Sequence, residues 1–121
     1  MKSINIKDKL SKFNKNWHPH QIAVVDNMQV ILAKLKGEFV WHSHDDEDEL
    51  FQVIKGTLYM QFRDRTEVVN EGEIIVVPKG VEHNPFTKND EEVHVLLFEK
   101  LSTAHTGKID HEKTQTHYPK I

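Results

Sequence analysis

Short apolar runs separated by turn residues dominate the chain from about residue 20 to about residue 100. Some runs alternate strictly: between residues 57 and 63, Leu58, Met60 and Phe62 occupy every second position. A period of two is typical of a β-strand, although it does not say which face of this run is buried. About eight or nine such runs occur, with turn residues every ~6 to 12 positions. The pattern predicts an all-β fold, either a sandwich or a small barrel.

The expected strands can be placed between the turn signals. We place them at residues 21–25, 28–36, 39–44, 50–54, 57–63, 66–69, 73–77, 83–86 and 93–98. Ahead of them, Ile6, Leu10 and Phe13 recur at helical spacing, so residues 3–13 are predicted to form an amphipathic helix with Ser3 as its N-cap.

Three segments follow from this assignment. Residues 1–20 would form an N-terminal helix and connector, and residues 21–101 would form the β-barrel. Residues 102–121 carry little apolar periodicity. A tail of that kind is ordered only when it is tied down, so we expect it to pack on the barrel or on a partner subunit.

Composition limits the functional classes. A chain of 121 residues fits one domain, and its formal net charge of −3 without a basic stripe argues against nucleic-acid binding. No apolar run approaches the ~20 residues that span a bilayer, so no membrane partner is expected. The chain has no cysteine, and its start lacks the apolar region of a signal peptide. We therefore expect a cytoplasmic protein.

Two histidines and a carboxylate lie close together in the middle of the chain. His42 and His44 are one residue apart, and on an extended segment both would project from the same face. Glu49 opens the next apolar run and can return a carboxylate to that face. Asp48 competes with Glu49 as the fourth ligand, but Glu49 is favoured because it is in phase with the apolar residues of its run. The other acidic residues nearby suit a solvated loop.

A third histidine follows a turn further along the chain. His83 comes after Pro78-Lys79-Gly80, a sequence that suits a tight turn. Three imidazoles and one carboxylate suit a divalent first-row transition ion, and the lack of thiolates argues against a structural zinc site. The expected cofactor is one Fe, Mn, Ni or Zn ion per chain, and no catalytic side chain is assigned. His94 could face the cavity or a neighbouring subunit, whereas the histidines of the connector and tail are expected to be exposed: His18, His20, His105, His111 and His117.

The spacing of these residues resembles the two motifs of a small single-domain cupin of the RmlC-like superfamily. The first motif is matched by Gly37, His42-Ser43-His44, Glu49 and Gly56, and the second by Gly72, Pro78-Lys79-Gly80 and His83. Two positions depart from the usual pattern: the spacer after Gly37 is one residue short, and Thr87 stands where asparagine is usual. The whole is similar to small bacterial cupins labelled mannose-6-phosphate isomerase-like.

The resemblance implies a jelly-roll barrel that holds a metal ion through His42, His44, Glu49 and His83. Two classes of function remain. The protein could be a metalloenzyme acting on a small molecule, either dioxygenase-like or isomerase-like, or a non-catalytic module that binds or senses a small molecule; metal-free sugar epimerase chemistry is a weaker third reading. We also expect a homodimer, because apolar residues occur on both faces of the strands.

Overall fold

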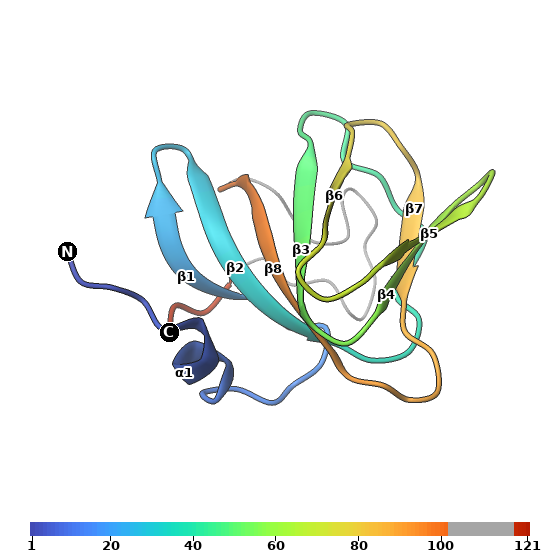
Figure 1. Cartoon of the computed structure of the whole chain (residues 1–121). Helices are drawn as coiled ribbons and strands as arrows, with labels where there is room; N and C mark the ends of the chain where they lie inside the picture. Colours follow the sequence, from blue (N-terminus) through green and yellow to red (C-terminus); the bar gives the residue numbers. More distant parts are fainter. Residues whose placement is uncertain (102–117) are drawn as a thin grey trace.

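Eight strands and one short helix make up the described part of the chain (Figure 1). The structure is a computed structural model, and it describes residues 1–101 and 118–121. In chain order the elements are α1 (Ile6–Leu10), β1 (His20–Val25), β2 (Met28–Leu35), β3 (Glu49–Lys55), β4 (Leu58–Phe62), β5 (Thr66–Val69), β6 (Ile74–Val77), β7 (His83–Phe86) and β8 (Val93–Lys100). The strands agree with the prediction to within a few residues at their ends, except over residues 39–44.

The strands pair into two antiparallel sheets. The larger sheet has the order β1-β2-β8-β3-β6, and the smaller one has the order β5-β4-β7. In Figure 1 the larger sheet extends from β1, in blue, to β6, and the smaller sheet lies at the right. Strands distant in sequence are neighbours, as β2 and β8 or β4 and β7 are. This two-sheet arrangement with non-sequential neighbours agrees with the predicted jelly roll.

The core lies between the two sheets and takes alternate side chains from their strands. On β4, Leu58, Met60 and Phe62 are buried, whereas Tyr59 and Gln61 on the opposite face are partly exposed. The structure thus answers the question that periodicity left open for this strand. The remaining buried apolar side chains of the core come from both sheets and are Ile31, Ala33, Leu35, Phe51, Val53, Val69, Val77, Val93, Val95 and Leu97.

The N-terminal helix is shorter than predicted. It begins after Asn5, whose side-chain oxygen accepts a hydrogen bond from the Asp8 amide at 2.8 Å, so Asn5 and not Ser3 is the N-cap. After the helix, the ring of Phe13 stacks on His20 with 4.0 Å between centroids, and its carbonyl accepts a 2.6 Å hydrogen bond from the Lys34 ammonium. These contacts attach the N-terminal segment to the outer side of β1 and β2.

The prediction of a strand over residues 39–44 is wrong. The segment is extended but makes only isolated bridges, between Glu38 and Phe86 and between His42 and His83. Its partner β7 has only four residues and also pairs with β4, so a regular ladder does not develop. The alternation still holds, because His42 and His44 are both buried.

The chain end returns to the barrel beside β1. The amide of Gln21 donates to the carbonyl of Pro119 at 2.8 Å, and the amide of Ile121 donates to the carbonyl of Gln21 at 3.1 Å. The rest of the predicted tail, with His105, His111 and His117, lies outside the described residues. Within the described ranges, no helix is long and apolar enough to cross a membrane.

Candidate metal centre

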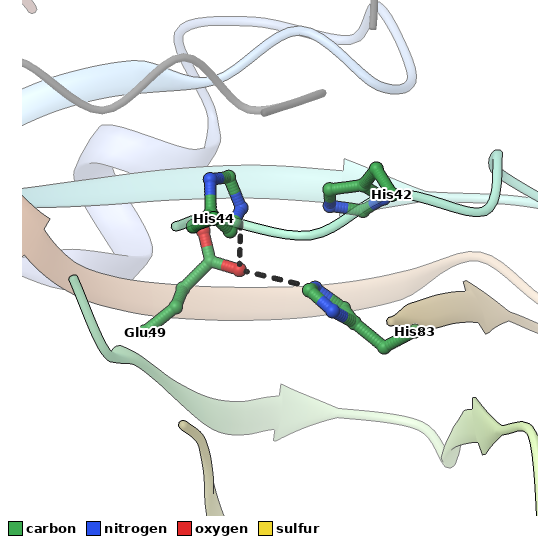
Figure 2. Close-up of side chains that lie close together, drawn as sticks. All are labelled: His42, His44, Glu49 and His83. Atoms are coloured by element: carbon green, nitrogen blue, oxygen red, sulfur yellow. Dashed lines mark ion pairs between the residues drawn. The ribbon is translucent and has the colours of Figure 1, made fainter. Parts of the chain in front are cut away.

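Four side chains meet between the two sheets (Figure 2). His42 and His44 come from the extended segment, Glu49 is the first residue of β3, and His83 is the first residue of β7. All four are buried, and one ligand atom from each lies within 4.8 Å of the others. The structure therefore brings together the four residues that the sequence pattern singled out.

Backbone hydrogen bonds set the spacing of the histidines. The amide of His42 donates to the carbonyl of His83 at 3.0 Å, and the amide of His83 donates back to His42 at 2.9 Å. This reciprocal pair puts the two residues directly opposite each other. Their rings face the same space, with centroids 4.2 Å apart.

The turn before His83 is fastened to the segment after His44. Gly80 has φ +80°, a value that favours glycine, and its amide donates to the His44 carbonyl at 2.8 Å. The amide of Lys79 donates to the Asp48 carboxylate at 2.9 Å. Asp48 is exposed and accepts this hydrogen bond from the turn, whereas Glu49 is buried and points inward. This agrees with the preference for Glu49 as ligand.

Two of the imidazoles are oriented by their own backbone. Nδ1 of His42 lies 2.8 Å from the carbonyl oxygen of Val40, and Nδ1 of His83 lies 2.9 Å from that of Val81. A carbonyl only accepts hydrogen bonds, so in each neutral ring Nδ1 carries the proton and Nε2 keeps its lone pair. Such a backbone contact on the remote nitrogen is common for histidines that bind metals.

The inner atoms of the cluster have no hydrogen-bond partner. This holds for Nε2 of His44, Nε2 of His83 and Oε1 of Glu49, all of which are buried. The Glu49 oxygen lies 3.4 Å from the first nitrogen and 3.6 Å from the second, longer than an ordinary hydrogen bond. Ligands bound at ~2.1 Å to one ion are about 3.0 to 3.4 Å apart when adjacent. The cluster could therefore hold a metal ion, which would satisfy these atoms.

Burial and mutual charge shift the ionisation of the cluster. Burial, together with the nearby His83, lowers the pKa of His42 to about 3. Burial also acts on His44, but its interactions with Glu49 outweigh it and raise the pKa of His44. Burial would raise the pKa of Glu49, yet the imidazoles of His44 and His83 hold it well below its usual range. An ionised carboxylate beside a neutral His42 is a set of groups suited to a cation.

A small apolar cavity adjoins the cluster. Its volume is about 30 Å³, and His42 and Glu49 are the cluster members in its wall. Trp17 stacks on Phe39 at 4.5 Å and donates its indole N–H to the Lys36 carbonyl at 2.9 Å. The other described wall residues are all apolar: Trp17, Pro19, Ala33, Leu35, Phe39, Phe51, Pro85 and Leu97. A larger open groove of about 1030 Å³ runs along β5 and β6 and contains none of the four cluster residues.

The histidines outside the motifs that the structure describes are His18, His20 and His94, and none of them is part of the cluster. Nε2 of His94 lies 2.9 Å from the Glu92 carboxylate, and His94 alternates with the inward residues of β8. His20 is buried against Phe13, contrary to the expectation that it is exposed. The sequence pattern did not single out Glu99, a further inward residue, which is fully buried near the end of β8.

A buried cluster of three histidines and one carboxylate inside a jelly-roll barrel defines a class of small β-barrel proteins able to hold a metal ion. The model of the cupin domain family matches residues 28–99, which is more than half of the chain. The chain therefore belongs to the cupin family, as the resemblance of its motifs implied, and its fold is the cupin jelly roll.

Two solved structures and a curated protein are similar to this chain. A cupin-2 domain protein from Shewanella frigidimarina is 47% identical, with a TM-score of 0.78 over 80% of this chain and 93% of that one. A protein from Neisseria meningitidis is 32% identical, with a TM-score of 0.74 over 82% of this chain and 99% of that one. The uncharacterized protein YdbB of Bacillus subtilis is 41% identical over 63 residues, which are 51% of this chain and 56% of YdbB. The chain thus spans little more than half of that curated relative.

Proposed function

We propose that this cupin is a metalloenzyme that binds one divalent first-row transition ion through His42, His44, Glu49 and His83 and acts on a small molecule. The observation that carries the proposal is the set of unpartnered inner atoms, since buried polar atoms without partners are rare. Three nitrogens and one oxygen leave Fe, Mn, Ni and Zn as candidates. Bound there, the ion would activate or polarise a molecule at coordination positions that the protein leaves open.

The cavity beside the cluster supports dioxygenase-like chemistry over sugar-phosphate isomerisation. Among the described wall residues, the groups that can ionise are those of His42 and Glu49, and no lysine or arginine lines the wall. A phosphate group is normally held by a cation or by several N–H donors. The volume of about 30 Å³ exceeds the ~10–15 Å³ that a cavity needs to hold one water molecule, so there is room for a molecule about the size of dioxygen.

The second candidate is a non-catalytic module that binds or senses a small molecule, and it is favoured by the apolar wall, because apart from His42 and Glu49 no described wall residue could act as a general acid or base. In such a protein the ion would hold a ligand in place and no bond would be made or broken. The absence of cysteine suits a reducing cytoplasm under either proposal, and the cytoplasm remains our proposed location.

Metal content tests the common part of both proposals. Protein purified without oxygen should contain about one transition ion per chain by elemental analysis. The double variant His42→Ala, His44→Ala should lose it, because two ligands are gone. The matched control is His94→Ala, which removes a histidine outside the cluster and should keep the ion. Unchanged metal content in the double variant would overturn the assignment.

Open coordination positions separate the enzyme from the binding module. In the enzyme, azide, or nitric oxide with a ferrous ion, should bind and change the spectrum of the metal. Glu49→Gln keeps the shape of the side chain but removes its charge, so it should suppress oxygen uptake with any substrate that supports it in the wild type. A centre that takes up neither probe and supports no turnover would favour the binding module.

A homodimer is a further part of the proposal, supported by the outer face of the larger sheet. The strand registers align Val76, Leu50, Phe98 and Val30 in one row across four strands. Val76 and its neighbour Ile74 are exposed, at 47% and 58%. Apolar rows of this kind usually mark an interface, and we propose that a second copy of the chain covers them.

Light scattering tests the dimer. The wild type should have twice the mass of one chain at micromolar concentration, and Val76→Lys should shift it towards the monomer. Val68→Lys is the matched control, since Val68 is similarly exposed but lies on the smaller sheet. A monomeric wild type would refute the proposal.

A further inference from the structure

Glu99 is the least expected residue inside the barrel. Along β8, Val93, Val95, Leu97 and Glu99 are buried in alternation, so Glu99 occupies a position of the core face. Its exposed fraction is 0%. A carboxylic acid is almost never buried to this extent without a partner, so its presence demands a physical explanation.

The strand register places Glu99 directly beside the metal centre. Leu50 pairs with Phe98, and Phe51 pairs with Leu97, so the next positions outward, Glu49 and Glu99, face each other across β3 and β8. Both side chains are inward and buried. Directly opposite side chains have Cβ atoms about 4.5 to 5.5 Å apart, close enough for the two carboxyl groups to touch.

No other side chain in the described part of the chain satisfies Glu99. Neither of its oxygens accepts a hydrogen bond from any N–H or hydroxyl group. Gln29 is its register partner on β2, but the amide of Gln29 donates to the Lys100 carbonyl at 3.3 Å and accepts from Gln21 at 3.0 Å. The neighbouring functional group that remains is the carboxylate of Glu49.

Two adjacent buried carboxylates do not both ionise, because their repulsion in a medium of low polarity is large. The surroundings assign the proton. Oε1 of Glu49 lies 3.4 Å from Nε2 of His44 and 3.6 Å from Nε2 of His83, whereas neither oxygen of Glu99 meets an N–H or hydroxyl donor, so the proton of the pair belongs on Glu99. A neutral carboxyl group has an O–H to donate, and the Glu49 carboxylate is an acceptor.

We propose that Glu99 is a positioning residue of the metal centre, whose carboxyl group donates a hydrogen bond to Glu49 and so keeps Oε1 of Glu49 turned towards His44 and His83. The inference rests on the proposed metal binding, and it adds a residue that is not one of the four ligands. Groups that hydrogen-bond a metal ligand typically alter metal affinity by ~10- to 100-fold when they are removed.

Two substitutions separate this role from its alternatives. Glu99→Gln retains a hydrogen-bond donor of nearly the same shape, so its affinity for Zn²⁺ should stay within about 3-fold of the wild type, by the same reasoning on retained contacts. Glu99→Leu removes the donor, and its affinity should fall by ~10- to 100-fold. Dissociation constants would be measured by competition with a chromogenic chelator on chelator-treated protein. Gln29→Leu is the matched control, since Gln29 flanks Glu99 but does not face Glu49, and it should bind Zn²⁺ as the wild type does.

The outcomes are distinct. Equal affinity in Glu99→Leu and the wild type would overturn the inference. A loss of affinity in Glu99→Gln as large as that in Glu99→Leu would also overturn the inference. The charge of Glu99, as in an ionised metal ligand, would then support metal binding, and not its hydrogen-bond donor. A wild type that binds no Zn²⁺ or other transition ion would instead refute the proposed function.

A second measurement covers the case in which Glu99→Leu fails to fold. The infrared spectrum of the metal-loaded wild type should contain the band of a protonated, buried carboxyl group, and Glu99→Gln should lack it. Absence of this band from the wild type would overturn the inference without reference to any variant that disturbs the core.

Discussion

His42 should make the metal-free protein sensitive to mild acid. Its pKa is lowered to about 3 by burial and by the nearby His83, against 6.5 for an unperturbed histidine. Below pH 6.5 the unfolded chain therefore binds a proton at this position that the folded chain does not. The sign follows from linkage: stability is fully present above pH 6.5 and is lost progressively as the pH falls towards about 3.

The loss of stability at pH 5 follows from the distance of pH 5 below the pKa of histidine in the unfolded chain. That distance is 6.5 − 5 = 1.5 units, and at 1.36 kcal/mol per unit the contribution of His42 is a loss of about 2 kcal/mol. The figure hardly changes if the folded pKa is anywhere below about 4, because the folded form is then neutral at pH 5 in every case. His44 acts in the opposite direction, since its pKa is raised in the folded chain and its proton stabilises the fold below pH 6.5.

The assay is urea unfolding of chelator-treated wild type and His42→Gln at pH 7 and pH 5. The wild type should lose about 2 kcal/mol more than the variant between the two pH values. Subtracting the loss of unfolding free energy in the variant from that in the wild type cancels the unequal stability of the two proteins at pH 7. To first order it also cancels the contribution of His44. If both proteins lose the same free energy, His42 is protonated in the folded state, and the reasoning from burial is refuted.

Three further predictions concern the frame of the site. Gly56→Ala should lower the free energy of unfolding in urea by about 1–3 kcal/mol more than Gly72→Ala does. Both glycines have φ above +80°, but a Cβ at Gly56 would lie 3.0 Å from Cγ2 of buried Val93, whereas a Cβ at Gly72 would meet nothing within 4 Å. Equal losses in the two variants would contradict this. Asp48→Ala should cost about 0.5–1.5 kcal/mol through the lost hydrogen bond from Lys79, and should weaken Zn²⁺ binding only a few-fold; an unchanged stability would show that this bond does not matter. Adding Zn²⁺ at 100 times its Kd should stabilise the chelator-treated protein by at most about 2.7 kcal/mol, seen as a higher Tm, and an unchanged Tm would count against a site in the folded state.

The four cluster residues could be predicted from the sequence because their signals are local. A spacing of two residues between His42 and His44 needs only an extended backbone to bring the rings to one face, whether or not a regular strand forms. The turn before His83 likewise depends on Gly80, whose positive φ is a property of that residue type. Both signals therefore hold although residues 39–44 do not form a regular strand.

Glu99 could not be found in this way. A glutamate followed by a lysine at the end of an apolar run is normally the polar flank of a strand. Its alternation with Val93, Val95 and Leu97 becomes informative only when β8 is known to lie between β2 and β3, and that register comes from pairings distant in sequence. The helix was overestimated for a different reason: serine and asparagine are equally good N-cap residues, so the sequence does not decide between Ser3 and Asn5.

The distribution of the four cluster residues along the chain has a consequence for folding. Three of them lie between residues 42 and 49, whereas the fourth is supplied by β7 after the chain has passed through β3 to β6. An unfolded or nascent chain therefore already carries three of the four proposed metal ligands within one short loop, and closing a short loop costs little entropy. Such a chain can capture an ion loosely before the barrel exists, and docking of His83 would then tighten the hold. Metal binding to the unfolded state also lowers the net stabilisation that the ion gives to the folded one.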